Sequence, residues 1–262
     1  MIPVKIIIPI YKEELLETEI LSLNQCAKIL GDYPVVYVAP ESLNAANYLK
    51  LLNGSVLRFP DDYFENINGY NRLMLSNAFY KSFIDTDYIL IYQLDAYVFK
   101  NELKYWCEKN YDYIGAPAHN VRLNSFEPPI SLVTLNGGLS LRKVRAHLNV
   151  LNNFKIIYPF SVLLKNNVTS SGYISGFLKA LYNYIFCNNT YHLFNKFDRN
   201  EDFFWAVLVP RLNSDFKVPP AEVSCFFSID NDPEKTFELT GEKLPFGCHA
   251  FDKNSNFWEK YI

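Results

Sequence analysis

The segment "YILIYQLDAYVFK", residues 88–100, places a single acid, Asp95, behind a run of apolar and aromatic residues. An ionised carboxylate inside an apolar strand costs several kcal/mol without a partner, so Asp95 is expected at a sheet edge, either paired or on a cation. Mg²⁺ and Mn²⁺ accept carboxylate oxygens and leave positions open for phosphate oxygens, so such an acid could hold a metal against a diphosphate. A strand-end acid that caps a turn is the structural alternative.

Two other patterns could also carry chemistry. The Gly137–Gly138 pair after Asn136 lets the backbone pass close to a ligand, although a tight turn between strands would use the same residues. Glu201 and Asp202 open a predicted helix in "NEDFFW". Acids in that position offset the helix dipole by about 0.3–1 kcal/mol, whether or not they take part in a reaction.

The motifs of several large enzyme classes are missing from the chain. The first predicted strand is followed by "YKEE" and no glycine-rich loop, and no P-loop sequence occurs anywhere, which disfavours dinucleotide-dependent dehydrogenases and P-loop NTPases. A sugar-nucleotide pyrophosphorylase would also need a glycine-rich loop at that place. GxSxG and HExxH are absent too, so hydrolases of those types are disfavoured.

Composition indicates a protein without a membrane span or a nucleic-acid partner. The chain has 262 residues, enough for one large domain, with 49% hydrophobic and 20% charged residues and a net charge of −3. Its five cysteines are scattered and show no zinc-ligand spacing, which favours a reducing, cytoplasmic location. The N-terminal apolar run lacks the features of a signal peptide and is expected to be a core strand.

Hydrophobic periodicity predicts alternating strands and helices. Strands are expected at 4–10, 34–40 and 87–99, with helices at 11–30 and 69–83 between them. Such continuous apolar strands are typical of parallel sheets covered on both faces, which bind ligands beyond their carboxyl ends. We therefore expect an α/β fold with its site at that edge.

The second half of the chain follows the same alternation around one unusual segment. A short strand and turn are expected at 111–117. Residues 128–151 are expected to form an extended segment, a Gly-Gly turn, a strand and a helix. A helix at 200–210, a strand at 222–230 and an ordered loop at 241–258 should follow. Residues 152–200 are rich in Asn, Tyr and Phe and predict an insertion with one amphipathic helix. This insertion could be a lid, an acceptor-binding subdomain or a packing helix.

Taken in order, the segments "IIIPIY", "YQLDAYVF", "YDYIGAP", "NGGLSLRK", "EDFFW" and "LPFGCHAF" resemble the GT-A glycosyltransferases. The resemblance is closest to a bacterial glycosyltransferase-like family, DUF5672, with a QxD variant of the DxD motif. It covers most of the chain outside 152–200. It implies one GT-A-like α/β domain over residues 1–262, with a mostly parallel central sheet flanked by helices and a helical insertion.

The resemblance implies a donor site for a nucleotide-diphosphate sugar. The end of the first strand, Pro9, Ile10 and Tyr11, would lie beside the base or ribose, with simple packing as the alternative for Tyr11. In the DxD-like motif, Asp95 would bind the metal, Mn²⁺ or Mg²⁺. Gln93 replaces the first acid; its amide can still hydrogen-bond a ribose hydroxyl but is a poorer ligand for a hard cation. The glycine loop would lie against the donor sugar.

The resemblance also implies the catalytic groups. Asp202 would be the general base that accepts the proton of the acceptor hydroxyl, and Glu201 would bind acceptor or donor. His249 would contact the metal or the diphosphate, with a structural histidine as its alternative. Arg72 is a candidate for the diphosphate. Arg142 is expected on the surface.

These expectations combine into one function and one alternative. The chain is expected to transfer a sugar to a hydroxyl of a glycan or lipid-linked glycan, in bacterial surface glycan synthesis, with inversion favoured. The alternative is an inactive GT-A-like protein that binds a nucleotide sugar or a glycan, which the Gln93 substitution favours. The segment "YISGFLKALYNYIF", residues 173–186, could make peripheral contact with the inner face of a membrane.

Overall fold

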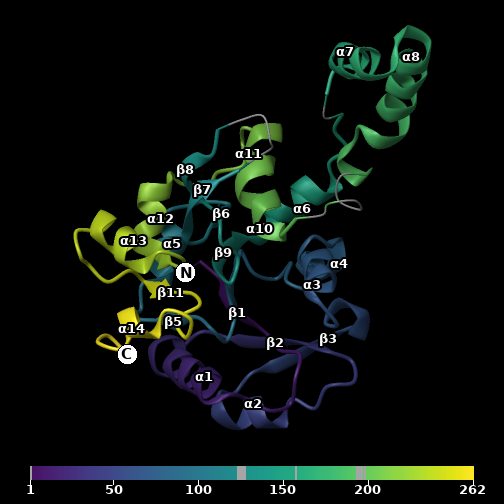
Figure 1. The fold of residues 1–262 in the computed structure, drawn as a ribbon. Coiled ribbons are helices and arrows are strands. Elements are labelled where there is room, and N and C mark those ends of the chain that lie inside the picture. The colour runs from purple at the N-terminus through teal and green to yellow at the C-terminus, as the bar shows by residue number, and fades with distance from the viewer. Residues whose placement is uncertain (1, 123–127, 157, 193–196, 198) are drawn as a thin grey trace.

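The computed structural model describes residues 2–122, 128–156, 158–192, 197 and 199–262. Its centre is a six-stranded sheet of order β3-β2-β1-β4-β9-β6 (Figure 1). The first four of these strands in sheet order run parallel, whereas β9 is antiparallel to β4 and β6 is antiparallel to β9. The expected mixed α/β class with a mostly parallel, helix-flanked sheet is confirmed.

The central sheet consists of β1 (Val4–Pro9), β2 (Val35–Pro40), β3 (Ser55–Phe59), β4 (Tyr88–Tyr92), β6 (Tyr113–Ile114) and β9 (Leu139–Lys143). A three-stranded sheet contains β10 (Ser228–Ile229), β11 (Gly247–Cys248) and β5 (Tyr97–Val98), and a hairpin pairs β7 (Pro117–Val121) with β8 (Ile130–Thr134). The three-stranded sheet matters for the site because it brings the C-terminal part of the chain beside the loop that follows β4.

The helices along the first half of the chain are α1 (Glu17–Leu30), α2 (Ala46–Leu51), α3 (Ile67–Met74), α4 (Asn77–Lys81), α5 (Leu103–Glu108) and α6 (Val144–Asn152). The second half contains α7 (Phe160–Ser171), α8 (Tyr173–Tyr182), α10 (Glu201–Phe203), α11 (Val209–Leu212), α12 (Ala221–Phe227), α13 (Pro233–Leu239) and α14 (Ser255–Trp258). Short π-helical segments follow α8 (Asn183–Cys187) and α10 (Phe204–Leu208), and a 3-10 turn spans Asp61–Tyr63.

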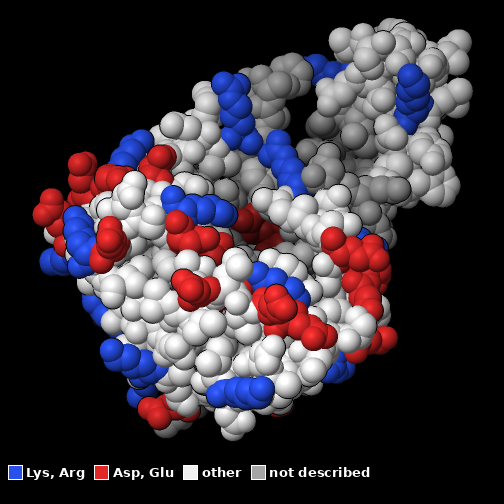
Figure 2. All heavy atoms as spheres, turned by 60° about the horizontal axis from the view of Figure 1, so that its bottom comes forward, with Lys and Arg blue, Asp and Glu red and all other residues white. Residues whose placement is uncertain are grey.

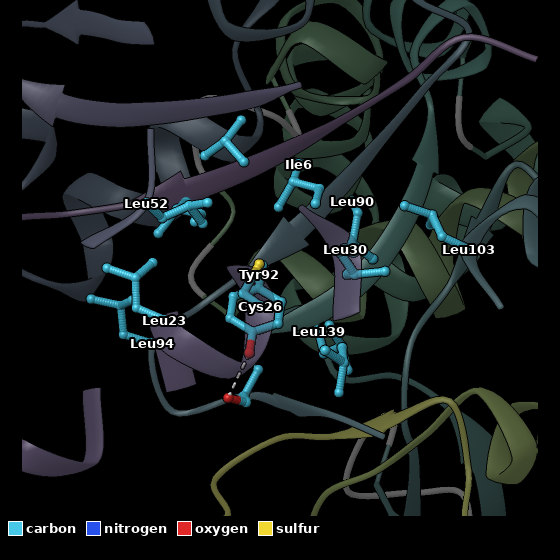
Figure 3. Packing of buried hydrophobic residues seen from close by; sticks show 14 of the residues in the cluster. Ile6, Leu23, Cys26, Leu30, Leu52, Leu90, Tyr92, Leu94, Leu103 and Leu139 are labelled. Atoms are coloured by element: carbon cyan, nitrogen blue, oxygen red, sulfur yellow. Dashed lines mark hydrogen bonds between the residues drawn. The ribbon is translucent and has the colours of Figure 1, made fainter. Parts of the chain in front are cut away.

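Both faces of the sheet are covered, as the apolar strands predict. On one face, Ile6 and Leu90 pack with Leu23, Cys26 and other residues of α1 (Figure 3). On the other face, Ile7, Ile89 and Ile91 pack against residues of α3, α4, α6 and the segment after α10. Adjacent strand residues point to opposite faces, so a strand buried on both sides must be apolar throughout.

A buried polar contact fixes the turn that follows β4. The Ser22 hydroxyl on α1 donates to the carbonyl of Ala96 at 2.6 Å and lies 3.2 Å from the Tyr92 hydroxyl. The Tyr92 hydroxyl in turn donates to the carbonyls of Ser22 and Ala96, at 3.0 and 3.2 Å. The turn that carries Asp95 is therefore anchored from beneath by α1.

Several predicted elements differ in the structure. The helix predicted at 69–83 is divided into α3 and α4, because the Ser76 side chain accepts from the amide of Phe79 and caps a new helix. The strand predicted at 222–230 is wrong over most of its length: Pro220 precedes helix α12, whose Ala221, Ser224 and Cys225 are buried at the i, i+3, i+4 spacing of a helix. The ordered loop predicted at 241–258 contains β11 and α14.

The insertion is more helical than expected. It forms two helices, α7 and α8, joined at Gly172, whose φ of +76° is a conformation that glycine adopts readily. The pair projects away from the body of the molecule in Figure 1. Among the described residues, no helix is long and apolar enough to cross a membrane.

We expect Ser22→Ala to lower the free energy of unfolding by about 1–3 kcal/mol, because it removes a donor from the buried Ala96 carbonyl and a partner from Tyr92. Thermal and urea unfolding measure this loss. Ser170→Ala is the matched control, because the exposed Ser170 hydroxyl also donates to a backbone carbonyl, and it should change stability by less than about 0.5 kcal/mol. Equal effects of the two substitutions would contradict the anchoring role.

Candidate functional site

Loops that are distant in sequence meet beyond the carboxyl end of β4. The amide of Gln93 donates to the carbonyl of Gly138 at 2.9 Å, which ties the turn after β4 to the glycine loop before β9. The amide of Phe251 donates to the carbonyl of Asp95 at 3.1 Å, and that of His249 to Ile229 at 2.8 Å. Backbone hydrogen bonds thus place Gln93, Asp95 and His249 together at the edge where parallel sheets bind ligands.

His249 is the centre of this cluster. Its Nε2 lies 3.0 Å from Asp95 Oδ1 and 3.1 Å from Gln93 Oε1, and its Nδ1 lies 3.0 Å from Asp230 Oδ1. Burial disfavours the charged imidazole, but the hydrogen bonds to Asp230 and Asp95 more than offset this and raise the pKa of His249 to about 9. Burial also acts against ionised Asp95, yet His249 holds its pKa below the usual value.

Asn136 connects the histidine to the glycine loop. Its amide nitrogen donates to Asp230 Oδ2 at 3.0 Å, and its amide oxygen accepts from the backbone of Gly138 at 2.9 Å. Asp230 also accepts from the side chain of Asn231 at 2.9 Å. Both oxygens of Asp230 are therefore engaged, and the histidine ring has a fixed orientation.

The two glycines are required by close approach. A Cβ on Gly138 would lie 2.0 Å from His249 Nε2, and one on Gly137 would lie 2.6 Å from Glu201 Oε1. Neither glycine has a positive φ, so a left-handed turn does not explain them. Any side chain here would occupy the space between His249 and the acids of α10.

Arg142 is buried, and its predicted surface position is wrong. The guanidinium donates to Glu201 Oε1 at 2.7 Å and Oε2 at 2.9 Å, with both side chains almost inaccessible to solvent. It also donates to Ser140 and to the hydroxyl of Tyr80, at 3.0 and 3.2 Å. The two-point contact neutralises Glu201 and fixes the start of α10 against β9.

Asp202 has a different environment from its neighbour. Burial, followed by the charge of Glu201, raises the pKa of Asp202 to about 7. One of its carboxylate oxygens accepts from the amide of Phe203 at 2.6 Å. Asp202 lines a cavity of about 310 Å³ together with a set of mostly polar residues: Asn136, Arg199, Asn200, Asp230 and Asn231, with Ala118, Leu135 and Phe203. A buried acid with a pKa near 7 can exchange a proton with a group in this cavity at neutral pH.

Sequence reasoning missed three of the polar residues here. Asp230 ends a segment that was expected to be a strand, and its acid at the end of an apolar run is the signal that could have identified it. Arg199 and Asn231 line the cavity without any motif around them.

One predicted site residue, Arg72, is not part of this cluster, whereas Pro9 ends β1 beside β4. Arg72 is exposed and pairs with exposed Asp62 at 3.1 Å, so the structure does not bring it to Asp95. Pro9 is the last residue of β1, Ile10 is buried after it, and Tyr11 is 64% exposed. Exposure of the Tyr11 ring argues against simple packing.

The other three histidines have no motif around them in the sequence, and we expected them to be surface or packing residues. His147 is buried against the rings of Tyr80 and Trp205, at centroid distances of 4.8 and 4.3 Å. His119 is 3.1 Å from the hydroxyl of Thr236. His192 follows Tyr191 at the base of the insertion.

The donor set at His249 is compatible with a divalent cation that displaces the proton from Nε2, because a histidine binds a metal only through a deprotonated ring nitrogen. Asp95 Oδ1 and Gln93 Oε1 each lie about 3 Å from His249 Nε2, which is roughly the separation of neighbouring ligands around an ion with bonds of about 2.1 Å. Asp230 on the far nitrogen is the outer carboxylate that metal-binding histidines often have. In the described part of the chain, however, no group of three His, Cys, Asp or Glu could hold a metal, so phosphate or water oxygens would have to complete the shell.

A family model described as "Protein of unknown function (DUF5672)" matches residues 53–249, about three quarters of the chain, and the chain belongs to this family. No curated protein matches the sequence.

Several solved structures match parts of this chain at low sequence identity and with TM-scores below 0.5. A glycosyltransferase involved in glycosylation of the major capsid of PBCV-1 is 12% identical over 94% of this chain and 92% of its own, with a TM-score of 0.42. The apo-form glycosyltransferase GlyE of Streptococcus pneumoniae TIGR4 is 8% identical over 95% and 54%, with a TM-score of 0.45. S. aureus TarS 1–349 in complex with UDP-GlcNAc is 14% identical over 72% and 54%, with a TM-score of 0.37.

The chain spans about one third of the length of full TarS and just over half of TarS 1–349.

We expect Arg142→Met to destabilise the protein by about 3–5 kcal/mol, because it leaves the buried Glu201 carboxylate without its partner. The double variant Arg142→Met/Glu201→Leu should recover most of this loss. Arg72→Met breaks the exposed pair with Asp62 and should cost less than about 1 kcal/mol. Urea unfolding of these three variants and the wild type tests this, and a double variant no more stable than Arg142→Met would contradict it.

The raised pKa of Asp202 also predicts a pH dependence of stability. The folded protein holds this proton more tightly than the unfolded chain, so the contribution to stability is complete below the usual pKa of 3.8 and is lost as the pH rises through about 7. Between these limits the free energy of unfolding should fall more steeply with pH in the wild type than in Asp202→Asn. Parallel curves from urea unfolding at each pH would contradict the shift.

Proposed function

We propose that this member of the DUF5672 family is a glycosyltransferase that moves a sugar from a nucleotide-diphosphate donor to a hydroxyl acceptor. One observation carries the proposal. The Asp95–His249 cluster and Asp202, whose pKa is raised to about 7, lie on either side of a glycine loop at the carboxyl edge of the parallel strands. A diphosphate on one side and an acceptor hydroxyl on the other would place a sugar between them.

Asp95, Gln93 and His249 would bind the donor diphosphate and ribose, with Pro9 and Tyr11 near the base. A divalent ion, Mn²⁺ or Mg²⁺, would be held by Asp95 and His249 and would supply positive charge to the leaving diphosphate. The side chain of Gln93 would contribute an amide oxygen or bind the ribose. Asn136 keeps the glycine loop open, so that the backbone of Gly137 and Gly138 could approach the sugar.

Asp202 would act as the general base. Its carboxylate would accept the proton of the acceptor hydroxyl while that oxygen forms a bond to the anomeric carbon, and the bond from that carbon to the diphosphate oxygen would break with the electron pair leaving on the diphosphate. Attack from the face opposite to the leaving group inverts the anomeric centre, which is the outcome we favour.

Glu201 is poorly suited to the same role. Both of its oxygens accept from Arg142, and this pair holds the neighbouring Asp202 in place. After burial, the charge of Glu201 is the second cause that raises the pKa of Asp202. We therefore assign Glu201 a positioning role. The acceptor would enter the polar cavity lined by Arg199, Asn231 and Asp230, whose amide and carboxylate groups suit the hydroxyls of a glycan. Synthesis of bacterial surface glycans, in the cytoplasm, is the setting that we propose for this transfer.

The second candidate function is nucleotide-sugar or glycan binding without transfer. It is favoured by Gln93, an amide where the DxD motif has an acid. The two candidates share the donor site and differ only in whether Asp202 has an acceptor to activate.

Two variants separate binding from transfer. Asp95→Ala should abolish binding of nucleoside diphosphates and their sugars in isothermal titration with Mn²⁺ or Mg²⁺, because it removes the only carboxylate of the QxD segment. Asp202→Asn should bind the donor like the wild type but lower the transfer rate about 10²–10⁴-fold. Asp62→Asn, which changes an exposed acid, is the control and should alter neither property.

The outcomes distinguish the two candidate functions. A wild type that binds nucleotide sugars but transfers nothing to any acceptor or to water supports the binding protein. If no nucleotide binds with or without metal, the donor site is assigned wrongly, transfer and nucleotide-sugar binding both fail, and glycan binding alone is left.

A further inference from the structure

We propose that residues 153–192, here called the arm, attach the protein to the surface of an anionic lipid bilayer. The arm contains α7, α8 and the π-helical segment after α8, and it extends away from the body in Figure 1. The proposal concerns a surface that takes no part in the site described above.

The arm contains more than half of the exposed large hydrophobic residues in the described part of the chain. Of the 23 large hydrophobic residues that are exposed in the described part of the chain, 13 lie in this segment: Phe154, Ile156, Tyr158, Val162, Tyr173, Ile174, Phe177, Leu178, Leu181, Tyr182, Ile185, Phe186 and Tyr191. Surface this apolar and contiguous is expected to be covered by a partner, because single exposed apolar residues are common but clusters of them are not.

The exposed apolar residues form one face of a continuous helical segment. From Tyr173 to Phe186 they recur in pairs about four residues apart, which places them on one side of a helix. Two of them, Tyr173 and Ile174, are 85% and 81% exposed. Tyr173–Cys187 contains 15 helical residues and would be roughly 22 Å long. That is a length for lying along a bilayer surface, consistent with the finding that no described helix could span one.

The opposite side of α8 is already occupied. Gly176 and Ala180 are buried in the packing against α7, and a Cβ on Gly176 would lie 2.5 Å from the Cα of Val168. Because the small residues face α7, the large ones are directed to solvent. The hairpin therefore keeps its apolar face exposed, and packing within the arm cannot cover it.

The base of the arm is held by hydrogen bonds. Asn188 donates to the carbonyl of Tyr158 at 2.7 Å and accepts from its amide at 2.9 Å. The hydroxyl of Thr190 donates to the carbonyl of Asn153 at 2.8 Å and accepts from the amide of Lys155 at 3.1 Å. These contacts join the segment before α7 to the segment after the π-helix, so α7 and α8 are held to the body as one unit.

The positive charge of the arm favours an anionic lipid surface as its partner. The sequence of the arm contains three lysines, Lys155, Lys165 and Lys179, and no Asp or Glu, although the whole chain has more acids than bases. In Figure 2 the arm, at the upper right, shows blue but no red side chains, whereas red and blue are mixed over the body. Lysines beside Tyr, Phe, Ile and Leu match an interface of anionic headgroups over acyl chains.

Flotation with lipid vesicles tests the proposal on the full chain. The wild type should float with vesicles in which one quarter of the phosphatidylcholine is replaced by phosphatidylglycerol, and binding should weaken at high salt and with pure phosphatidylcholine. Ile174→Glu/Leu178→Glu should weaken binding by at least about tenfold. The matched control, Ile84→Glu/Leu239→Glu, changes two exposed apolar residues of the body and should leave binding unchanged.

The lysines have their own test. Lys165→Gln/Lys179→Gln should weaken binding to the anionic vesicles by about tenfold or more and should leave binding to neutral vesicles unchanged. Far-ultraviolet circular dichroism and nucleotide titration of each variant report whether the body is still folded.

Three results would overturn the proposal. The wild type does not float with anionic vesicles at low salt, the arm variants bind like the control, or the wild type is a dimer in the absence of lipid. The last is measured by light scattering during gel filtration. A wild-type dimer that Ile174→Glu/Leu178→Glu converts to a monomer would make this face a contact between two copies of the chain. Because none of these measurements needs transfer activity, they remain informative if the proposed function fails.

Discussion

The buried ion pair between Arg142 and Glu201 joins the sheet to the helix that carries Asp202. A charge in this position is costly to bury, and each partner is acceptable only because the other is there. Tyr80 of α4, Ser140 of β9 and the amide contact of Glu201 with Asn71 of α3 complete its surroundings. Four elements are thus fixed relative to one another around a single pair, and the pKa of Asp202 depends on that arrangement.

The second centre, His249, is organised in a similar way by hydrogen bonds instead of a fixed charge pair. Asp230 and Asn136 orient one side of the ring, which leaves Nε2 directed at Asp95 and Gln93. The glycine loop passes between the two centres, and its missing side chains are what allow both to face one space. The geometry of the proposed site therefore depends on the close approach of the Gly137–Gly138 backbone as much as on the acidic side chains.

The sequence predicted the parts of this arrangement that follow from local pattern. Apolar runs located β1, β2 and β4, and an acid just beyond β4 had to lie at the edge. Arg142 could not be placed, because "LSLRK" alternates like a strand with one solvent-exposed face. Only the docking of α10 onto that face buries the Arg142 side chain. Asp230 was missed because Pro220 starts a helix where apolar and β-branched residues had indicated a strand.

The three-stranded sheet affects the order in which parts of the molecule can fold during synthesis. Asp95 is separated from His249 by 154 positions in the sequence, and they meet because β11 lies between β5 and β10. A chain emerging from the ribosome can form the four parallel strands while the histidine is still unsynthesised. The cluster around His249 would assemble only after β10 and β11 have emerged, so the nascent domain acquires its sheet early and the edge with the proposed site last.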